Sequence, residues 1–267
     1  MPTINVNDIN LYYEVHGQGE PLVLIHGMTL DCTAWEPQLA DFCKQYQVIV
    51  FDNRGVGRSD APNGDYSTDS MTKDTVALLD ALKIDSAHVI GVSMGGMIAQ
   101  KLAIQYPQRV KSLILVSSTA KMPPFGKHVM QVWLRMLEEK VESETILREQ
   151  LSWLFTERFF EDPVQIDAVV KTVLNHPHAQ PVNGFKGQIA ALLEHDTSAQ
   201  LNQIPVSTLV LAGKEEKVLS LKSFEALSAG IPKSQLSLLE GGGHSFFMEI
   251  PKSFNRAVLA FLKQVTA

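Results

Sequence analysis

The sequence predicts an α/β fold with a mostly parallel central sheet flanked by helices, and three observations lead to this prediction. Continuously apolar segments that are typical of buried parallel strands recur along the chain, at residues 21–28, 47–52 and 110–117. Segments with helical periodicity separate them, as expected of strand-helix-strand units. One strand-to-helix junction carries a glycine-rich turn around Ser93. The length of 267 residues, 45% of them hydrophobic, suits one large globular domain or two small ones.

Most of the predicted strands lie in the first 117 residues. Two strands around the Asn7-Asp8 turn are expected to form a hairpin at the edge of the sheet, at residues 3–6 and 9–15. Buried strands follow at residues 21–28 and 47–52, from Ala87 to the turn at Ser93, and at residues 110–117. Helices are expected between them, at residues 35–42, at 67–82 and directly after Ser93.

The alternation of strands and helices breaks between Met122 and about Gln203. Only helical segments are predicted there, at residues 125–140, 143–160, 163–175 and 185–195. The sheet resumes afterwards with strands at 207–213 and 235–239 and helices at 222–229 and 253–265. An insertion between sheet strands lies at their carboxyl ends or edge, where α/β proteins bind ligands. We therefore interpret residues 122–203 as a helical cap inserted before the last two strands, and residues 1–121 with 204–267 as the core domain.

The turn after the strand from Ala87, Gly91-Val-Ser93-Met-Gly95, matches the pattern G-x-S-x-G between a strand and a helix. A chain that lifts a serine hydroxyl clear of a sheet must turn sharply, which leaves no room for a Cβ two residues before or after the serine. The serine also stands at a helix N-terminus, where free N–H groups favour developing negative charge. An ordinary glycine-rich turn would give the same five letters, so the interpretation depends on partner residues elsewhere.

Residues that could work with Ser93 follow later strands. His244 lies in a glycine-rich loop after the last predicted strand, and Glu215 and Glu216 follow the strand at 207–213. A serine hydroxyl needs an adjacent imidazole as base, and the imidazole needs a carboxylate that fixes its tautomer and stabilises its charged form. The chain therefore presents the order serine, acid, histidine.

Two backbone N–H groups are also needed near the nucleophile to stabilise an oxyanion. Met94, the residue after Ser93, is expected to supply one of them. Met28, which follows His26-Gly27 at the end of a buried strand, is placed to supply the other. His26 is an alternative base, but its position on the strand that leads to Met28 favours a structural role.

Together these motifs resemble those of the α/β-hydrolase fold family over nearly the whole chain. The matching segments are His26-Gly27, residues 52–59, residues 91–96, Arg109-Val110, residues 213–216 and Gly243-His244. The stretch from Gly91 to Gln100 most resembles the branch that contains 3-oxoadipate enol-lactonases and small carboxylesterases. The family usually has Asp where this chain has Glu216, and this alignment favours Glu216 over Glu215 as the acid.

The resemblance, together with Ser93 and His244, predicts a hydrolase that cleaves a carboxylic ester or lactone of a small molecule. The reaction would pass through an acyl-enzyme on Ser93 and need no cofactor. Two alternatives remain open, namely cleavage of a carbon–carbon bond by a hydrolase or lyase of this fold, and a receptor that binds its ligand without turnover. The cap is expected to set specificity, with Trp133, Trp153 and Phe159 as candidate pocket residues.

Charge and composition disfavour other classes of function. A net charge of −6 disfavours nucleic acid or anionic membrane as the main partner. The N-terminal residues lack the features of a signal peptide, no apolar run is long enough to span a membrane, and Cys32 and Cys43 are interpreted as reduced thiols, so a cytoplasmic location is expected. His176-Pro-His178 lacks a third ligand, so no metal is expected, and the loop at 53–60 lacks phosphate-binding spacing. Substrate identity and oligomeric state are left open.

Overall fold

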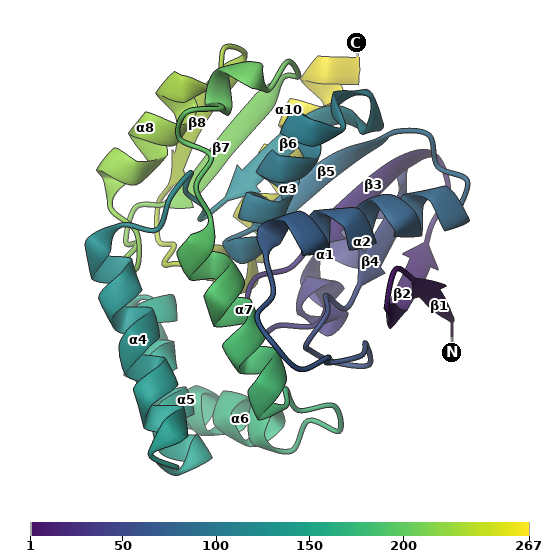
Figure 1. Cartoon of the computed structure of the whole chain (residues 1–267). Coiled ribbons are helices and arrows are strands. Elements are labelled where there is room, and N and C mark those ends of the chain that lie inside the picture. Colours follow the sequence, from purple (N-terminus) through teal and green to yellow (C-terminus); the bar gives the residue numbers. More distant parts are fainter. Residues whose placement is uncertain (1, 267) are drawn as a thin grey trace.

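The computed structural model describes residues 2–266 and contains an eight-stranded, mostly parallel sheet with helices on both faces (Figure 1). The fold class predicted from the sequence is confirmed. The strands are β1 (Thr3–Val6), β2 (Ile9–His16), β3 (Glu20–Ile25), β4 (Tyr46–Phe51), β5 (Ala87–Val92), β6 (Val110–Val116), β7 (Thr208–Gly213) and β8 (Ser234–Leu239).

The helices occupy the segments between and after these strands. Those before the insertion are α1 (Glu36–Phe42), α2 (Thr68–Ala81) and α3 (Met94–Gln105). Those that follow β6 are α4 (Pro124–Glu138), α5 (Ser143–Leu154), α6 (Pro163–Leu174), α7 (Val182–Glu194), α8 (Leu221–Gly230), α9 (Phe246–Glu249) and α10 (Pro251–Thr266). Short 3₁₀ helices are η1 (Cys32–Trp35), η2 (Pro107–Arg109), η3 (Glu157–Glu161) and η4 (Leu201–Gln203).

The order of the strands across the sheet is β1-β2-β4-β3-β5-β6-β7-β8. β1 and β2 form the hairpin predicted around Asn7-Asp8, with Val6 paired to Ile9, and β2 is antiparallel to β4. The remaining neighbours are parallel. β5 therefore lies between β3 and β6, and the loops after these three strands meet at their carboxyl ends.

Each face of the sheet has its own apolar core, because alternate residues of a strand point to opposite faces. In β3, Val23 and Ile25 belong to a buried cluster with residues of α2, α3 and α8. Leu22 and Leu24 belong to a second cluster with residues of α1, α9 and α10. Both faces are covered, which explains why the strands appear in the sequence as continuous apolar runs rather than as alternating patterns.

The helices α4 to α7 gather on one side of the molecule, outside the two layers that cover the sheet (Figure 1). They lie between β6 and β7 in the chain, and an isolated antiparallel bridge between Lys121 and Asp196 joins the beginning and the end of this segment. α4 packs against α7 and α5, and α5 packs against α6. We call this segment the helical insertion; its limits as a cap domain, residues 122–203, stay a prediction.

The predicted C-terminal end of one helix in the insertion is wrong. The sequence predicts a single helix over residues 143–160, whereas α5 ends at Leu154 and η3 follows. Phe155 has extended backbone angles of φ −118° and ψ 160°. Hydrogen bonds from the core hold the C-terminal end of α5. The carbonyl oxygen of Leu154 accepts one from the N–H of Ser245 (2.9 Å), and the carbonyl oxygen of Phe155 accepts one from Nζ of Lys217 (3.1 Å). Helical periodicity carries no information about these bonds from distant residues.

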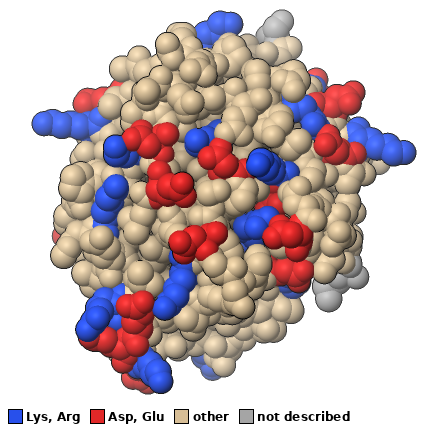
Figure 2. Space-filling model, viewed as in Figure 1, with Lys and Arg blue, Asp and Glu red and all other residues tan. Residues whose placement is uncertain are grey.

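Basic and acidic side chains are mixed on the visible face of the molecule. On the face shown in Figure 2, Lys and Arg side chains lie among Asp and Glu side chains and do not gather into one broad field. Elsewhere in the described part of the chain, charged side chains form ion pairs, such as Arg109 with Asp80 (2.7 Å) and Lys121 with Asp196 (2.7 Å). Within residues 2–266, no helix has the length and apolar character needed to span a membrane.

Candidate active site

Ser93 lies in the sharp turn that links β5 to α3. Its backbone angles, φ 52° and ψ −115°, fall in a region that residues other than glycine rarely adopt. A Cβ at Gly91 would collide with the backbone of Gly95, and a Cβ at Gly95 would collide with the backbone of Ile25. The expectation that neither position has room for a Cβ is confirmed, and the turn holds the Ser93 hydroxyl out of the sheet.

A chain of hydrogen bonds connects Ser93 to a buried carboxylate. Nε2 of His244 lies 3.1 Å from Oγ of Ser93, and Nδ1 of His244 lies 2.8 Å from Oε2 of Glu216. With the Nδ1 proton directed at the carboxylate, Nε2 can accept the serine proton. The side chains of His244 and Glu216 are only 8% and 3% exposed, so bulk water competes little for the bond between them.

The structure joins Glu216, and not Glu215, to His244. The loop after β7 turns so that the side chain of Glu216 enters the protein while that of Glu215 is exposed. Oε1 of Glu216 accepts the N–H groups of Val218 (2.7 Å) and Leu219 (3.2 Å), and this leaves Oε2 for the histidine. The loop that carries the Glu216 carboxylate therefore fixes its orientation toward the imidazole.

Two serines after β6 support the turn and the histidine loop, and the sequence analysis did not single them out. Oγ of Ser118 donates to the carbonyl oxygen of Ser93 (2.9 Å), and Oγ of Ser117 donates to the carbonyl oxygen of His244 (2.9 Å). Each hydroxyl therefore donates its proton to a backbone carbonyl oxygen of the site. A signal was available, because both serines stand at the carboxyl end of a predicted strand, which the structure places beside β5.

Of the two residues predicted to supply oxyanion-stabilising N–H groups, Met28 lines the cavity in front of Ser93 and Met94 does not. Met94 is the first residue of α3, so its N–H has no acceptor within that helix. Met28 follows Gly27 after the end of β3 and lines the same cavity as Ser93. Within residues 2–266, the N–H of Met28 makes no hydrogen bond to another backbone group.

His26 orients the peptide unit that carries the Met28 N–H. Its Nδ1 donates to the carbonyl oxygen of Gly27 (2.8 Å), and its Nε2 accepts the N–H of Asn53 (3.0 Å). These two bonds assign the neutral tautomer, and complete burial lowers the pKa of His26. The Gly27 carbonyl and the Met28 N–H belong to one planar peptide, so the bond to Gly27 also aims the Met28 N–H. His26 is a structural residue, and both its nitrogens are unavailable to act as the base.

A mostly apolar cavity lies in front of Ser93 and His244. The empty space in it is about 710 Å³ when the part open to solvent is included. The loops after β3, β5 and β6 form its inner end, and the helical insertion forms much of the remaining wall. The insertion contributes Met122, Met130, Trp133, Gln150, Leu154 and Leu192, and the loop after Glu216 contributes Val218 and Leu219.

Of the three predicted pocket residues, the structure brings only Trp133 to the cavity. Trp153 lies outside it, edge-on to Phe125, with a distance of 5.4 Å between the ring centroids. Phe159 lies in a small separate core of the insertion and stacks on Phe155 at 4.3 Å. The prediction that Trp153 and Phe159 line the pocket is therefore wrong, because their rings pack against other residues of the insertion.

The histidines that were set aside as metal ligands have other partners. Nε2 of His176 lies 3.4 Å from Oδ2 of Asp31, and Nδ1 of His176 accepts the N–H of His178 (3.3 Å). Among residues 2–266, no group of three or more His, Cys, Asp or Glu side chains is arranged to hold a metal ion. Cys32 and Cys43 are both free thiols.

The fold and the site together define the class of protein. The strand order, the turn at Ser93 and the loops that carry Glu216 and His244 have the arrangement expected of the resembled family. The sequence model of the alpha/beta hydrolase fold matches residues 20–251. The chain belongs to the α/β-hydrolase fold family.

The relatives that this chain resembles include proteins named as hydrolases. The chain is 34% identical to 3-oxoadipate enol-lactonase 2 of Acinetobacter baylyi, over 98% of this chain and 96% of that protein. It is 32% identical to the provisionally named carbamate hydrolase RutD of Azorhizobium caulinodans, over 99% of both chains. The crystal structure of the enol-lactonase from Burkholderia xenovorans superposes with a TM-score of 0.87 at 26% identity, over 98% of this chain and 100% of that chain.

Proposed function

We propose that this protein is a serine hydrolase that cleaves a carboxylic ester or lactone of a small molecule through an acyl-enzyme on Ser93. The observation that carries the proposal is the pair of contacts at His244, 3.1 Å to the hydroxyl of Ser93 and 2.8 Å to the carboxylate of Glu216. These contacts lie at the inner end of a cavity lined mostly by apolar side chains.

The first half of the reaction uses each of these groups. Nε2 of His244 takes the proton of Ser93 as Oγ attacks the substrate carbonyl carbon, and Glu216 stabilises the imidazolium that results. The N–H groups of Met28 and Met94 stabilise the negative charge on the carbonyl oxygen. The carbonyl re-forms, the C–O bond to the leaving alcohol breaks, and His244 gives its proton to that alcohol oxygen.

The second half returns the enzyme to its starting state. His244 takes a proton from water, the hydroxide attacks the acyl carbon, and the bond to Ser93 Oγ breaks with return of the proton to Oγ. With a lactone substrate a single hydroxy acid is released, because the alcohol and the acyl group belong to one substrate molecule. No step needs a metal or an organic cofactor.

The lining of the cavity favours a small, largely apolar substrate. Met130, Trp133 and Leu192 of the helical insertion surround the space in which the substrate would lie, so we assign the insertion the role of a cap that sets specificity. The names of the Acinetobacter and Burkholderia relatives describe lactone hydrolysis. A cytoplasmic location belongs to the same proposal.

A panel of substrates tests this function against its alternatives. Purified protein is expected to hydrolyse p-nitrophenyl esters or simple lactones, and Ser93→Ala is expected to abolish turnover. Activity confined to carbon–carbon bond cleavage would support the second enzymatic alternative. Tight binding of a lactone without turnover by the wild-type protein would support a receptor, and activity that survives in Ser93→Ala would contradict the assigned nucleophile.

A further inference from the structure

The side chain of Gln188 reaches from α7 of the helical insertion to the loop that contains Met28. Its Oε1 accepts the N–H of Thr29 (3.1 Å), and its Nε2 donates to the carbonyl oxygen of Arg54 (3.0 Å). Nε2 of Gln180 donates to the same Oε1 (2.9 Å). Gln188 is completely buried, so both ends of its amide are used inside the protein, where an unmade hydrogen bond is costly.

Thr29 directly follows Met28 and has an unfavourable backbone conformation. Its φ is 67°, which β-branched residues rarely adopt, so contacts with the surrounding structure must hold it there. The hydrogen bond to Gln188 is one such contact, and it fixes the peptide unit on the C-terminal side of Met28. His26 fixes the peptide unit on the N-terminal side through the Gly27 carbonyl. Met28 is therefore held on one side by the core and on the other by the insertion.

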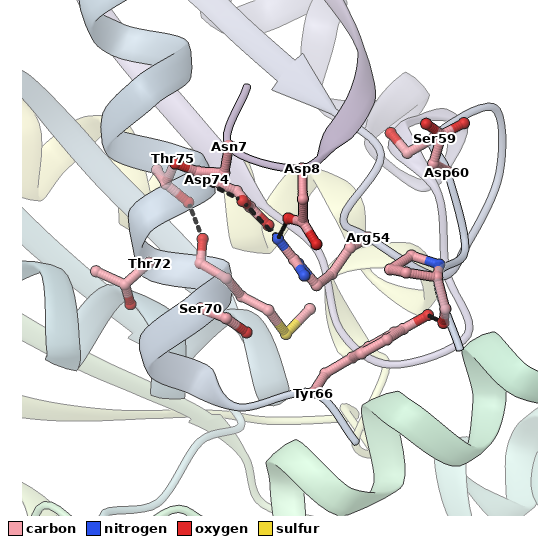
Figure 3. A network of polar contacts seen from close by, with 12 residues as sticks. Asn7, Asp8, Arg54, Ser59, Asp60, Tyr66, Ser70, Thr72, Asp74 and Thr75 are labelled. Atoms are coloured by element: carbon pink, nitrogen blue, oxygen red, sulfur yellow. Dashed lines mark hydrogen bonds and ion pairs between the residues drawn. The ribbon is translucent and has the colours of Figure 1, made fainter. Parts of the chain in front are cut away.

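The other end of the Gln188 amide is bound to a well-anchored part of the core. Nε and Nη2 of Arg54 contact the two carboxylate oxygens of Asp74 at 2.6 Å and 2.8 Å, and Nη2 also contacts Asp8 at 3.0 Å. Figure 3 shows the Arg54 side chain extended toward Asp74 on α2, with Asp8 close to the guanidinium and the ring of Tyr66 nearby. A buried bidentate pair is geometrically specific, so the Arg54 carbonyl is a fixed acceptor for Gln188.

Glycines bring α7 close enough to the core for this contact. A Cβ at Gly184 would collide with the carbonyl oxygen of Gly55, and a Cβ at Gly187 would lie 2.7 Å from the ring of Tyr66. The backbone of α7 therefore packs directly on the loop that follows Arg54. Because the helix itself is fixed, Gln188 can transmit its position to Thr29.

We propose that Gln188 is a positioning residue for the oxyanion hole, which holds Thr29 and, through it, the N–H of Met28. This inference rests on the proposed function of Ser93 and Met28. Oxyanion donors accelerate a reaction only when they are already aimed at the place where charge develops. The loss of the Gln188 acceptor should therefore lower kcat while leaving the binding of uncharged substrate, and so KM, nearly unchanged.

The first test replaces the amide with an apolar side chain of similar length. Gln188→Met is expected to lower kcat on a p-nitrophenyl ester by about 10-fold to 100-fold, less than the ~10²–10³-fold loss typical when a donor is removed outright. Asn183→Leu is the matched control. Asn183 also lies on α7 and also donates to a backbone carbonyl of the core, that of Ala61 (2.6 Å), but the N–H of Thr29 is bound by Gln188 and not by Asn183. Its kcat should equal that of the wild type.

Two inhibitors distinguish a misplaced oxyanion hole from a general loss of structure around the active site. An alkyl trifluoromethyl ketone adds to Ser93 and places an oxyanion in the hole, whereas an uncharged alcohol product binds without one. The inhibition constant of the ketone should rise in Gln188→Met by the same factor as kcat falls, and that of the alcohol should stay the same. A purely structural loss would weaken both inhibitors or neither.

The conservative variant provides a second, independent readout. A protonated glutamic acid has the shape and hydrogen-bonding groups of glutamine, so Gln188→Glu should approach wild-type kcat at low pH. As pH rises and the carboxyl ionises, its oxygen can no longer donate to the Arg54 carbonyl and is repelled by it. The side chain then leaves its place beside Thr29, and the ratio of variant to wild-type kcat should fall. This measurement decides the matter if Gln188→Met does not fold.

Three results would count against the proposal. Wild-type kcat in Gln188→Met contradicts it, and so does a pH-independent ratio for Gln188→Glu. A wild-type protein that neither hydrolyses esters nor binds the ketone contradicts the proposed function of Ser93, and the role of Gln188 then falls with it. An active wild type with an equally active Gln188→Met contradicts the role of Gln188 alone.

Discussion

The carboxylate of Glu249 accepts two hydrogen bonds from Thr156: its Oε1 lies 3.0 Å from the backbone N and 2.7 Å from Oγ1. Its other oxygen, Oε2, accepts the N–H of Gly243 (3.0 Å), the residue before His244. One side chain thus joins the segment after α5 to the loop that carries His244. The placement of the imidazole depends on the helical insertion as well as on the sheet.

Glu249→Gln should weaken this connection. One amide nitrogen would face a backbone N–H, so at least one bond is lost and a buried donor is left unpaired. The free energy of unfolding should fall by about 1–3 kcal/mol. kcat should fall by up to ~10²-fold, as expected when a catalytic group is displaced by a fraction of an ångström to 1 Å. Urea unfolding and ester hydrolysis measure the two effects.

Thr156→Val is the control for Glu249. It removes the hydroxyl bond but keeps the backbone N–H and the bond to Gly243, so it should cost about 1 kcal/mol of stability and leave kcat near the wild-type value. If Glu249→Gln has wild-type stability and kcat, the carboxylate does not hold the histidine loop.

The two adjacent glutamates should behave differently when each is replaced by Gln. Glu216→Gln keeps the shape of the side chain but removes the charge that stabilises the His244 imidazolium, and a loss of about 10⁴-fold in kcat is expected by analogy with serine proteases. Glu215→Gln alters an exposed side chain and should be nearly silent. Steady-state kinetics on any accepted ester distinguish them. An inactive Glu215→Gln with an active Glu216→Gln would overturn the assignment.

Two tryptophans provide a matched pair for testing specificity. The indole N–H groups of Trp133 and Trp153 both donate to the carboxylate of Glu149, but only Trp133 lines the cavity. Trp133→Phe and Trp153→Phe therefore lose the same kind of hydrogen bond. Only Trp133→Phe should change the relative kcat/KM for esters of different acyl length, by about 1–3 kcal/mol per pair of substrates. Equal shifts in both variants would mean that the cavity wall does not set specificity.

Acid should destabilise the protein in part through His195. This residue follows α7, and its ring nitrogens contact the hydroxyls of Thr68 (3.0 Å) and Thr197 (3.4 Å). Burial lowers its pKa from 6.5 to about 4. The unfolded chain therefore binds a proton that the folded protein does not, and stability is lost as pH falls from about 6.5 to about 4, by about 3 kcal/mol at most.

His195→Gln removes this titration. Its free energy of unfolding, measured with urea between pH 7.5 and pH 4, should fall less steeply than that of the wild type, and the two curves should approach each other in acid. Parallel curves would show that His195 does not titrate between the folded and unfolded states.

The sheet and the turn at Ser93 were predictable because the signals are local. Gly91 is required by crowding against Gly95 within the turn, and Gly95 is required by crowding against the end of the neighbouring strand β3. The strands are apolar because helices cover both faces of the sheet. The acid was harder to assign. Glu215 and Glu216 are chemically identical, and only the bonds of Glu216 to the next two backbone N–H groups and to His244 distinguish them.

The wall of the cavity and the supports of the site could not be predicted in the same way. Trp153 and Phe159 have the size and character of pocket residues, and only their packing against other residues of the insertion excludes them. Gln188 and Glu249 carry no motif at all. Their contacts join segments more than 90 residues apart, such as Gln188 with Thr29 and Glu249 with Thr156.

The identity of the nucleophile is the central claim, and active-site labelling tests it most directly. The protein is treated with a fluorophosphonate, digested, and its modified peptide is identified by mass spectrometry. We expect a single adduct on Ser93, no adduct in Ser93→Ala, and loss of ester hydrolysis in proportion to the labelled fraction. An adduct on another residue, or labelling and turnover that persist in Ser93→Ala, would contradict the account.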